Sequence, residues 1–285
     1  MADKKETVGL VALKDALSTQ SVKERFEQML GKKSAGFISN IMSVAQNNAM
    51  FQKVERSSVI LAAAQAASLD LSINPNLGLA ALIPYGNICQ FQVQRDGWVE
   101  LCLRTGQFEY IVNEIVYEGE LVKRDRFTDT YIFDETKRKS DKPIGYMAAF
   151  KLIDGYRKTV YWTFEECKAH GLKYSQTFKK GKGLWVDNFH AMALKTVLKH
   201  LLKKYAPKSI EIINKAMEVD QAAFTGSIDN PQPVYVDNDN NAGEKNMATE
   251  EFQEAEVVAS KQPTSHAAPA AEAPAAGEVP EEYKI

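Results

Sequence analysis

The spacing of apolar residues predicts a helical N-terminal region. The segments VKERFEQML and FISNIMSVAQNNAMF place apolar side chains three and four positions apart, which is the period of an amphipathic helix. SSVILAAAQAASLDL continues this period, and Ser57 is the expected N-terminal cap of its helix. We therefore expect residues 1–50 to form a helical region that serves in oligomerisation.

From residue 79 the apolar period changes from helical to alternating. The segment LAALIPYGNICQFQV predicts a β-hairpin that turns at Tyr85, Gly86 and Asn87. The buried face of its second strand would hold Cys89, Phe91 and Val93. The opposite face would be polar but uncharged, with Gln90, Gln92 and Gln94.

The middle of the chain continues with one helix and several strands. A short helix in GWVELCLRTG is expected to end at Gly106. The segments that read as strands are FEYIVNEIVYEG, TDTYIFDE, IGYMAAFKLIDG and KTVYWTF. The predicted fold class is α+β, with a central antiparallel, hairpin-rich sheet.

The last predicted element is a long basic helix that starts at Asp187, its expected cap, and ends at Tyr205. Its apolar residues share one face, and Lys195, Lys199 and Lys203 form a separate stripe. From about Gly226 the chain is rich in Pro, Ala, Asn, Asp and Glu, which predicts a disordered acidic tail. We divide the chain into residues 1–50, a core at 51–215, and a tail at 226–285.

The charge distribution changes this picture, because the net charge of -2 conceals a strong asymmetry. Residues 216–285 contain 14 acidic and 3 basic side chains, whereas residues 168–208 contain ten lysines and one acidic residue, Asp187. A local field of this kind indicates a polyanionic partner, most often nucleic acid. The alternative for residues 168–208 is a surface loop and helix that their lysines keep soluble. The acidic tail could compete with DNA, recruit a partner or only aid solubility.

Several kinds of active site are absent from the sequence. The run GKKS at residues 31–34 lacks the first glycine of a phosphate-binding loop, the four histidines lack zinc-ligand spacing, and no GxSxG nucleophile motif occurs. No cofactor is expected, although annealing could depend on Mg²⁺. Scattered carboxylates such as Glu100, Glu114 and Glu165 leave a Mg²⁺-dependent nuclease as an alternative. Unpaired cysteines and the lack of a signal peptide or membrane span favour the cytoplasm and no membrane partner.

The chemistry of single-strand binding is concentrated around residues 173–204. Cations suit phosphates, and flat aromatic rings suit exposed bases. The candidate residues of this region are Lys173, Tyr174, Phe178, Lys179, Lys180, Lys182, Trp185, Lys195, Thr196, Lys199 and Lys203. Trp185 could equally anchor the following helix in the core. A second candidate region contains Gln92, Gln94, Arg95 and Arg104, whereas LVKRDRF and TKRKSDKP indicate a solvated hairpin.

Three long segments in order resemble the RecT family of phage and prophage single-strand annealing proteins. They are SSVILAAAQAASLDLSINPNLGLAALIPYGN, FQVQRDGWVELCLRTGQFEYIVNEIVYEGE and WVDNFHAMALKTVLKHLLKKYAPKS, within residues 57–209. The family's tryptophan, its Met-Ala-x-Lys-Thr run and the basic position after it correspond to Trp185, residues 192–196 and Lys199. Members often carry a second lysine in that run, where this chain has Leu194, and an aromatic-basic-Gly triplet at residues 95–97, where it has Arg-Asp-Gly.

The resemblance implies an ATP-independent, non-enzymatic protein that coats single-stranded DNA and anneals it to a complementary strand. Such proteins assemble into rings or helical filaments, hold the annealed duplex, and work with a 5'-to-3' exonuclease and a host single-strand-binding protein. The expected location is the cytoplasm of a bacterium, with a phage or prophage gene. A structural protein that self-assembles without DNA remains the other alternative. The hypothesis for the site is a groove built from Lys195, Lys199 and the loop at 179–182.

Overall fold

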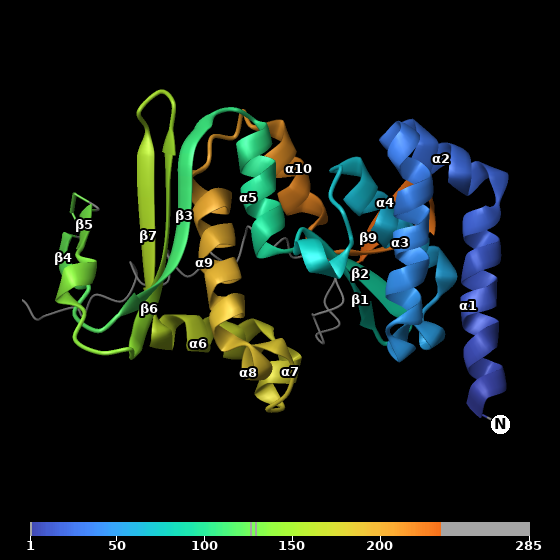
Figure 1. The fold of residues 1–285 in the computed structure, drawn as a ribbon, viewed down its shortest axis with the longest axis horizontal. Coiled ribbons are helices and arrows are strands. Elements are labelled where there is room, and N and C mark those ends of the chain that lie inside the picture. Colours follow the sequence, from blue (N-terminus) through green and yellow to red (C-terminus); the bar gives the residue numbers. More distant parts are fainter. Residues whose placement is uncertain (1, 126, 129, 235–285) are drawn as a thin grey trace, which may run out of the picture. The chain divides into compact units, whose positions relative to one another are not determined.

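The computed structural model describes residues 2–125, 127–128 and 130–234, and it confirms an α+β fold with N-terminal helices and antiparallel sheets (Figure 1). The helices are α1 (Ala2–Ser18), α2 (Gln20–Leu30), α3 (Ser34–Gln46), α4 (Arg56–Ser68), α5 (Arg95–Arg104), α6 (Phe164–Tyr174), α7 (Gln176–Lys179), α8 (Leu184–Asp187), α9 (Phe189–Tyr205) and α10 (Glu211–Val219). The strands are β1 (Ala80–Tyr85), β2 (Ile88–Val93), β3 (Phe108–Tyr117), β4 (Leu121–Asp125), β5 (Thr130–Phe133), β6 (Pro143–Leu152), β7 (Arg157–Thr163), β8 (Ala223–Ser227) and β9 (Asn230–Val234). Their division into two sheets and a separate hairpin corrects the prediction of one central sheet.

The N-terminal helices pack together, as their apolar period predicts. Leu17, Phe26 and Ile41 come from α1, α2 and α3, and each is almost fully buried. Helix α4 behind them is buried on all sides, which explains why residues 58–67 contain no charged side chain. The cap at Ser57 is a wrong prediction, because α4 begins at Arg56.

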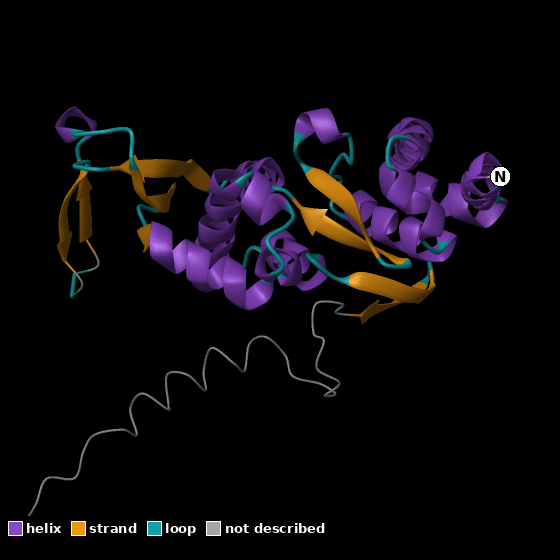
Figure 2. Ribbon diagram, turned by 90° about the horizontal axis from the view of Figure 1, so that it is seen from below, coloured by secondary structure: helices purple, strands orange, loops and turns teal. Residues whose placement is uncertain are grey.

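The first sheet has the strand order β1-β2-β8-β9. Its strands lie beside the N-terminal helices (Figure 2, strands in orange and helices in purple). Strands β1 and β2 form the predicted hairpin, in which Tyr85 pairs with Ile88 and Gly86 takes a φ of 58°. Cys89, Phe91 and Val93 are buried as expected. Gln90 is buried too, at 1% exposure, so the opposite face of β2 is not the solvated face that the alternation predicts.

The hairpin of β8 and β9 corrects the predicted start of the tail. Residues 226–234 complete this hairpin, whereas the rest of the tail, from residue 235, lies outside the described residues. The composition of NPQPV resembles a tail because it contains Pro231 and Pro233. Prolines two positions apart are nevertheless compatible with an edge strand, where the missing N–H groups face away from the neighbouring strand.

The second sheet has the strand order β3-β6-β7, and β4 pairs with β5 in a separate hairpin. Helix α9 packs its apolar side chains against β6 and β7, and Val197, Leu198, Leu201 and Leu202 are buried there. The predicted long helix is α9, which ends at Tyr205 as expected. Its cap is Asn188 (φ -146°, ψ 62°) rather than Asp187, which is the last residue of the short helix α8 before it.

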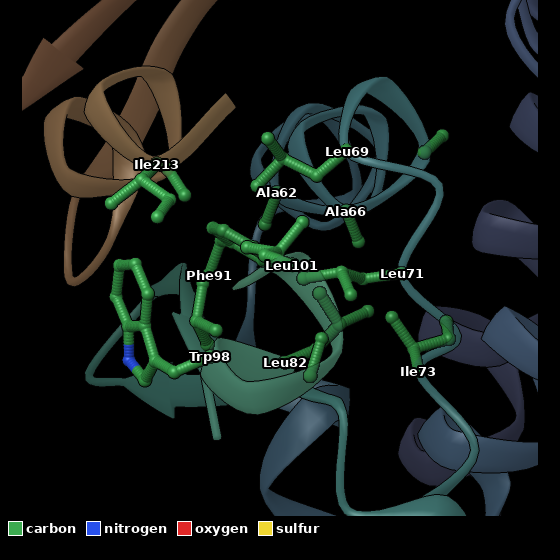
Figure 3. Close-up of a cluster of buried hydrophobic side chains, with 14 of the residues drawn as sticks. Ala62, Ala66, Leu69, Leu71, Ile73, Leu82, Phe91, Trp98, Leu101 and Ile213 are labelled. Carbon is green, nitrogen blue, oxygen red and sulfur yellow. The ribbon is translucent and has the colours of Figure 1, made fainter. Parts of the chain in front are cut away.

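A buried apolar cluster joins α4, the first sheet, α5 and α10 (Figure 3). Phe91 from β2 and Leu101 from α5 are fully buried, and Ile213 from α10 lies beside Trp98 of α5. This cluster fixes α10, and therefore the segment after it, against β2. That segment, residues 220–222, carries much of the polar chemistry described below.

Candidate nucleic-acid interface

A cluster of polar side chains lies between α9, β2 and the segment after α10. We call it the Asp220 cluster; its members are Gln90, Gln92, Lys195, Lys199, Asp220 and Gln221. The Lys199 ammonium lies 2.5 Å from the carboxylate of Asp220 and donates to the side-chain oxygen of Gln221 at 3.2 Å. The cluster therefore brings together residues that are more than 120 positions apart in the sequence.

The glutamines of β2 extend this network to Lys195. The Lys195 ammonium donates to Gln92 Oε1 at 3.4 Å, and Gln92 Nε2 donates to Gln90 Oε1 at 2.7 Å. Gln90 in turn donates to the backbone carbonyl of Gln221. Gln92 was expected to be available to DNA, but its side chain is hydrogen-bonded to Lys195 and Gln90.

Lys195 is a buried cation rather than part of a solvated stripe. Only 5% of the residue is exposed, so Lys195 is not part of the accessible lysine stripe, separate from the buried face of the helix, that the sequence predicts. Burial lowers the pKa of Lys195 to about 8; the carboxylate of Asp220 opposes this shift and the charge of Lys199 adds to it. Lys199 keeps 21% of its side chain exposed, and Lys203 is half-buried.

The backbone around Asp220 holds this cluster in place. Asp220 Oδ1 accepts a hydrogen bond from the Val93 N–H at 2.8 Å, and the Gln221 N–H donates to the carbonyl of Phe91 at 2.9 Å. Gln221 has a φ of 64°, in the left-handed region that few residues other than glycine adopt. The strain is compensated by these bonds, which fix the carboxylate against the last residue of β2.

The predicted lysine loop is exposed and lies between α7 and α8. Ser175 caps α7 by accepting from the Phe178 N–H at 3.2 Å. Gly181 and Gly183 follow with φ angles of 67° and 85°, which other residues would adopt only with strain. Lys179, Lys180 and Lys182 are all exposed, as a phosphate-binding loop requires.

Trp185 anchors this loop in the core and is not available to stack on a base. Its side chain is 7% exposed and packs against Phe178 and Phe189, at centroid distances of 5.8 and 5.5 Å. Gly171 makes room for it, since a Cβ there would lie 2.9 Å from the indole. Phe178 is half-buried, whereas Tyr174 is 40% exposed, with the Lys173 ammonium 5.2 Å from its ring.

The second predicted region is only partly directed outward. Arg104 donates to Glu100 at 2.8 Å and to the carbonyls of Leu69 and Asp70 at 3.1 and 2.9 Å, so its guanidinium ties α5 to the loop after α4. Arg95 is exposed and pairs with the adjacent Asp96 at 2.9 Å. Gln94 and Thr196 are half-buried; the Thr196 hydroxyl donates to the Met192 carbonyl at 2.8 Å.

Three further residues, Trp162, His170 and His200, form a cluster of rings between β7, α6 and α9, and the sequence reasoning did not select them. Trp162 of β7 packs against His170 of α6 and His200 of α9, at centroid distances of 5.4 and 4.9 Å. His170 also contacts Tyr174 at 4.6 Å. Burial, together with the smaller effects of the charges of His200, Lys199 and Lys173, lowers the pKa of His170 to about 4. These rings come from three elements, so only the spacing of His170 and Tyr174 gives a sequence signal.

The carboxylates considered for a metal do not form a group in the described part of the chain. No set of three or more His, Cys, Asp or Glu residues there could hold a metal ion. Glu100 pairs with Arg104, while Glu114 and Glu165 lie on β3 and α6. Within the same residues, the helices are too short or too polar to cross a membrane.

Comparison with known proteins identifies the family. A sequence model of the RecT family matches residues 35–235. The chain is 44% identical over 209 residues to "Uncharacterized protein YqaK" of Bacillus subtilis (strain 168). The matched region covers 73% of this chain and 72% of that protein. It is 28% identical over 173 residues to "Protein RecT" of Escherichia coli (strain K12), which covers 58% of this chain and 62% of that protein. The chain therefore belongs to the RecT family, whose annealing proteins are non-enzymatic and act in single-strand annealing recombination.

Proposed function

We propose that this protein binds single-stranded DNA through the lysines of α6, the loop at 179–182 and α9, and anneals it to a complementary strand without ATP. The observation that carries the proposal is the exposure of Lys179, Lys180 and Lys182 on one short loop, within residues 168–186, which contain no acidic side chain. Three ammonium groups on one loop without a nearby carboxylate in the sequence create a local positive potential. That potential suits a phosphate.

The lysines have different roles in this proposal. Lys179, Lys180 and Lys182 are exposed, so they contact phosphates directly and supply affinity that does not depend on sequence. Lys199 reaches the surface with part of its side chain while Asp220 holds the ammonium in one direction. Lys195 lies behind the surface and holds the Asp220 cluster in register, rather than touching DNA.

Contacts to phosphates leave the base edges free, which annealing requires. A first strand held by its backbone can still test a second strand for complementarity. Because each protomer offers few such cations, a long strand needs several protomers in a row. We therefore also propose an oligomer or filament, with the N-terminal helices as the contact region; Val11 and Met50 are 50% and 57% exposed there, and a neighbouring protomer would cover them.

The family likeness supports further partners. A 5'-to-3' exonuclease would expose the strand that this protein coats, and a host single-strand-binding protein would be displaced from it. Both remain part of the proposal, together with a phage or prophage origin and action in the bacterial cytoplasm.

An annealing assay with the full chain tests the proposed function. Two complementary oligonucleotides, each with one dye of a fluorescence-transfer pair, are mixed with protein in the presence and absence of ATP and Mg²⁺. We expect faster annealing than without protein, no requirement for ATP and intact strands on a denaturing gel. Cleaved strands in Mg²⁺ would indicate a nuclease instead. Polymers that form without DNA and do not accelerate annealing would indicate a structural protein.

A further inference from the structure

A small cavity lies where the β4–β5 hairpin, β7 and the end of α9 meet. Its volume is about 220 Å³, and the residues that line it and that matter here are Arg124, Tyr131, Trp162, Glu166, His200 and Tyr205. Sites for drug-sized ligands occupy roughly 300–1,000 Å³, so this cavity suits a single flat ring rather than a large cofactor. None of these residues belongs to the lysine loop or to the Asp220 cluster.

Cations lie beside two of the rings that line this cavity, Tyr131 and Tyr205. The Lys158 ammonium lies 4.2 Å from the centroid of the Tyr205 ring, and the Arg124 guanidinium lies 5.5 Å from that of Tyr131. The Lys204 ammonium also lies 5.5 Å from the Tyr205 ring. Cations beside flat rings form a surface that can hold a base and its phosphate together.

Strand β7 adds hydrogen-bonding groups to the wall of the cavity. Within the residues that the structure describes, β7 pairs with β6 on one side only. Residues 159–162 of β7 line the cavity, so the strand edge that pairs with no described strand borders this region. Glu166 is the acidic residue of the lining, and its carboxylate accepts from the N–H and hydroxyl of Thr163 at 2.7 and 3.0 Å.

We infer that this cavity accepts a nucleobase of bound single-stranded DNA, between the rings of Tyr131 and Tyr205 and beside Trp162. The inference rests on the proposed function and adds a base-binding site to the phosphate contacts. Arg124 and Lys158 hold the adjoining phosphate. Rings that accept any base give stacking without sequence preference, which suits a protein that anneals strands of any sequence.

The open edge of β7 could also receive a peptide strand, but the chemistry favours a base. Strand addition depends on backbone hydrogen bonds and on pockets for alternate side chains. Here five lining residues carry rings, Tyr131, Tyr161, Trp162, His200 and Tyr205. Three cations, Arg124, Lys158 and Lys204, lie beside two of these rings, and the carboxylate of Glu166 is already bonded. A peptide partner is therefore kept as an outcome of the test.

A cycle that removes the ring and the base separately tests the inference. The affinity of the full chain is measured for an oligothymidylate and for an oligomer of the same length in which every base is replaced by an abasic site. Tyr131→Ala should weaken binding of the intact oligomer roughly 5- to 100-fold and change binding of the abasic oligomer little. Tyr131→Phe keeps the ring and should behave like the wild type. Tyr110→Ala, at a 42% exposed tyrosine of β3, is the matched control.

The outcomes separate this inference from the proposed function. If the wild type binds neither oligomer, the proposed function is wrong. If the wild type binds both oligomers, and removal of the bases lowers the affinity of Tyr131→Ala as much as that of the wild type, the cavity does not hold a base. Tyr131→Ala could instead change the self-association of the DNA-free protein while base removal still weakens its DNA binding as much as that of the wild type. That result would show that Tyr131 contacts another protein chain, and it would also overturn the inference. Photocrosslinking of wild-type protein to a thiothymidine oligomer gives a second readout. The inference predicts crosslinks to residues of the cavity lining, and crosslinks confined to other residues would contradict it.

Discussion

The ammonium of Lys199 and the carboxylate of Asp220 form an ion pair at 2.5 Å in which the carboxylate side chain is fully shielded from solvent. The second oxygen of Asp220 accepts the Val93 N–H, so one carboxylate joins α9 to the end of β2. Buried ion pairs contribute little net stability, but the loss of one partner leaves a buried charge. Lys199 is therefore a structural residue as well as a candidate DNA contact.

We predict that Lys199→Ala lowers the free energy of unfolding by about 2–3 kcal/mol, a value reduced from that of a fully buried pair because Lys199 is partly exposed. Urea unfolding followed by circular dichroism measures this change. Lys203→Ala, one turn further along α9, should stay within about 0.5 kcal/mol of the wild type. The double variant Lys199→Met, Asp220→Asn should recover part of the loss. Equal stability of Lys199→Ala and Lys203→Ala would contradict the role given to the pair.

Lys195 gives a pH dependence in the alkaline range. Its pKa is 10.5 in the unfolded chain and about 8 in the folded protein, so the unfolded state binds the proton more tightly. The free energy of unfolding should therefore fall as the pH falls from about 10.5 to about 8 and then level off, with about 3 kcal/mol as the upper bound. Lys195→Met should remove this slope in urea titrations. A variant that keeps the wild-type slope would show that Lys195 is not the group responsible.

His170 should destabilise the fold in acid. Its pKa is 6.5 in the unfolded chain and about 4 in the folded protein, because burial and nearby cations disfavour the charged ring. The unfolded state thus takes up the proton first, and the free energy of unfolding should fall as the pH falls from about 6.5 to about 4. His170→Gln should show a shallower fall over this window. Melting temperatures of both proteins across the window provide the comparison, and parallel curves would argue against the assignment.

Gly171 should be sensitive to the smallest side chain. A Cβ at this position would lie 2.9 Å from the Trp185 ring and 3.0 Å from the Phe178 ring. Because neither ring can move without disturbing the core around Phe189, Gly171→Ala should cost about 1–3 kcal/mol of stability. Gly36→Ala in α3, where a Cβ would meet no atom within 4 Å, is the control and should not be destabilised. Thermal unfolding distinguishes the two, and equal midpoints would place Trp185 outside the core.

Much of the fold follows from local sequence patterns. The turn at residues 85–87, the strands β3, β6 and β7, and the apolar face of α9 all follow from short-range periodicity, which the folded chain preserves. The division into separate sheets does not follow, because strand order depends on contacts between distant segments. Likewise β9 resembles a tail in composition, since nothing local indicates that β8 will be its partner.

In the candidate site, the sequence predicted the exposure only of residues whose environment does not depend on contacts with distant segments. The exposure of Lys179, Lys180 and Lys182 follows from a short loop with two glycines. The burial of Lys195 could not be predicted, because Asp220 and Gln92 reach it from other elements. Their contacts depend on α10 docking against β2, which no spacing in the sequence encodes.

The salt dependence of single-strand binding tests the central claim most directly. Each lysine that contacts a phosphate releases about 0.7 counterions from a single strand, so Lys179→Ala, Lys180→Ala and Lys182→Ala together should reduce the slope of log affinity against log salt by about 2. The matched control removes the same charge from exposed lysines of other elements: Lys32→Ala, Lys139→Ala and Lys142→Ala. We predict a shallower slope and slower annealing for the loop variant alone. A loop variant with the slope and annealing rate of the control would contradict the account.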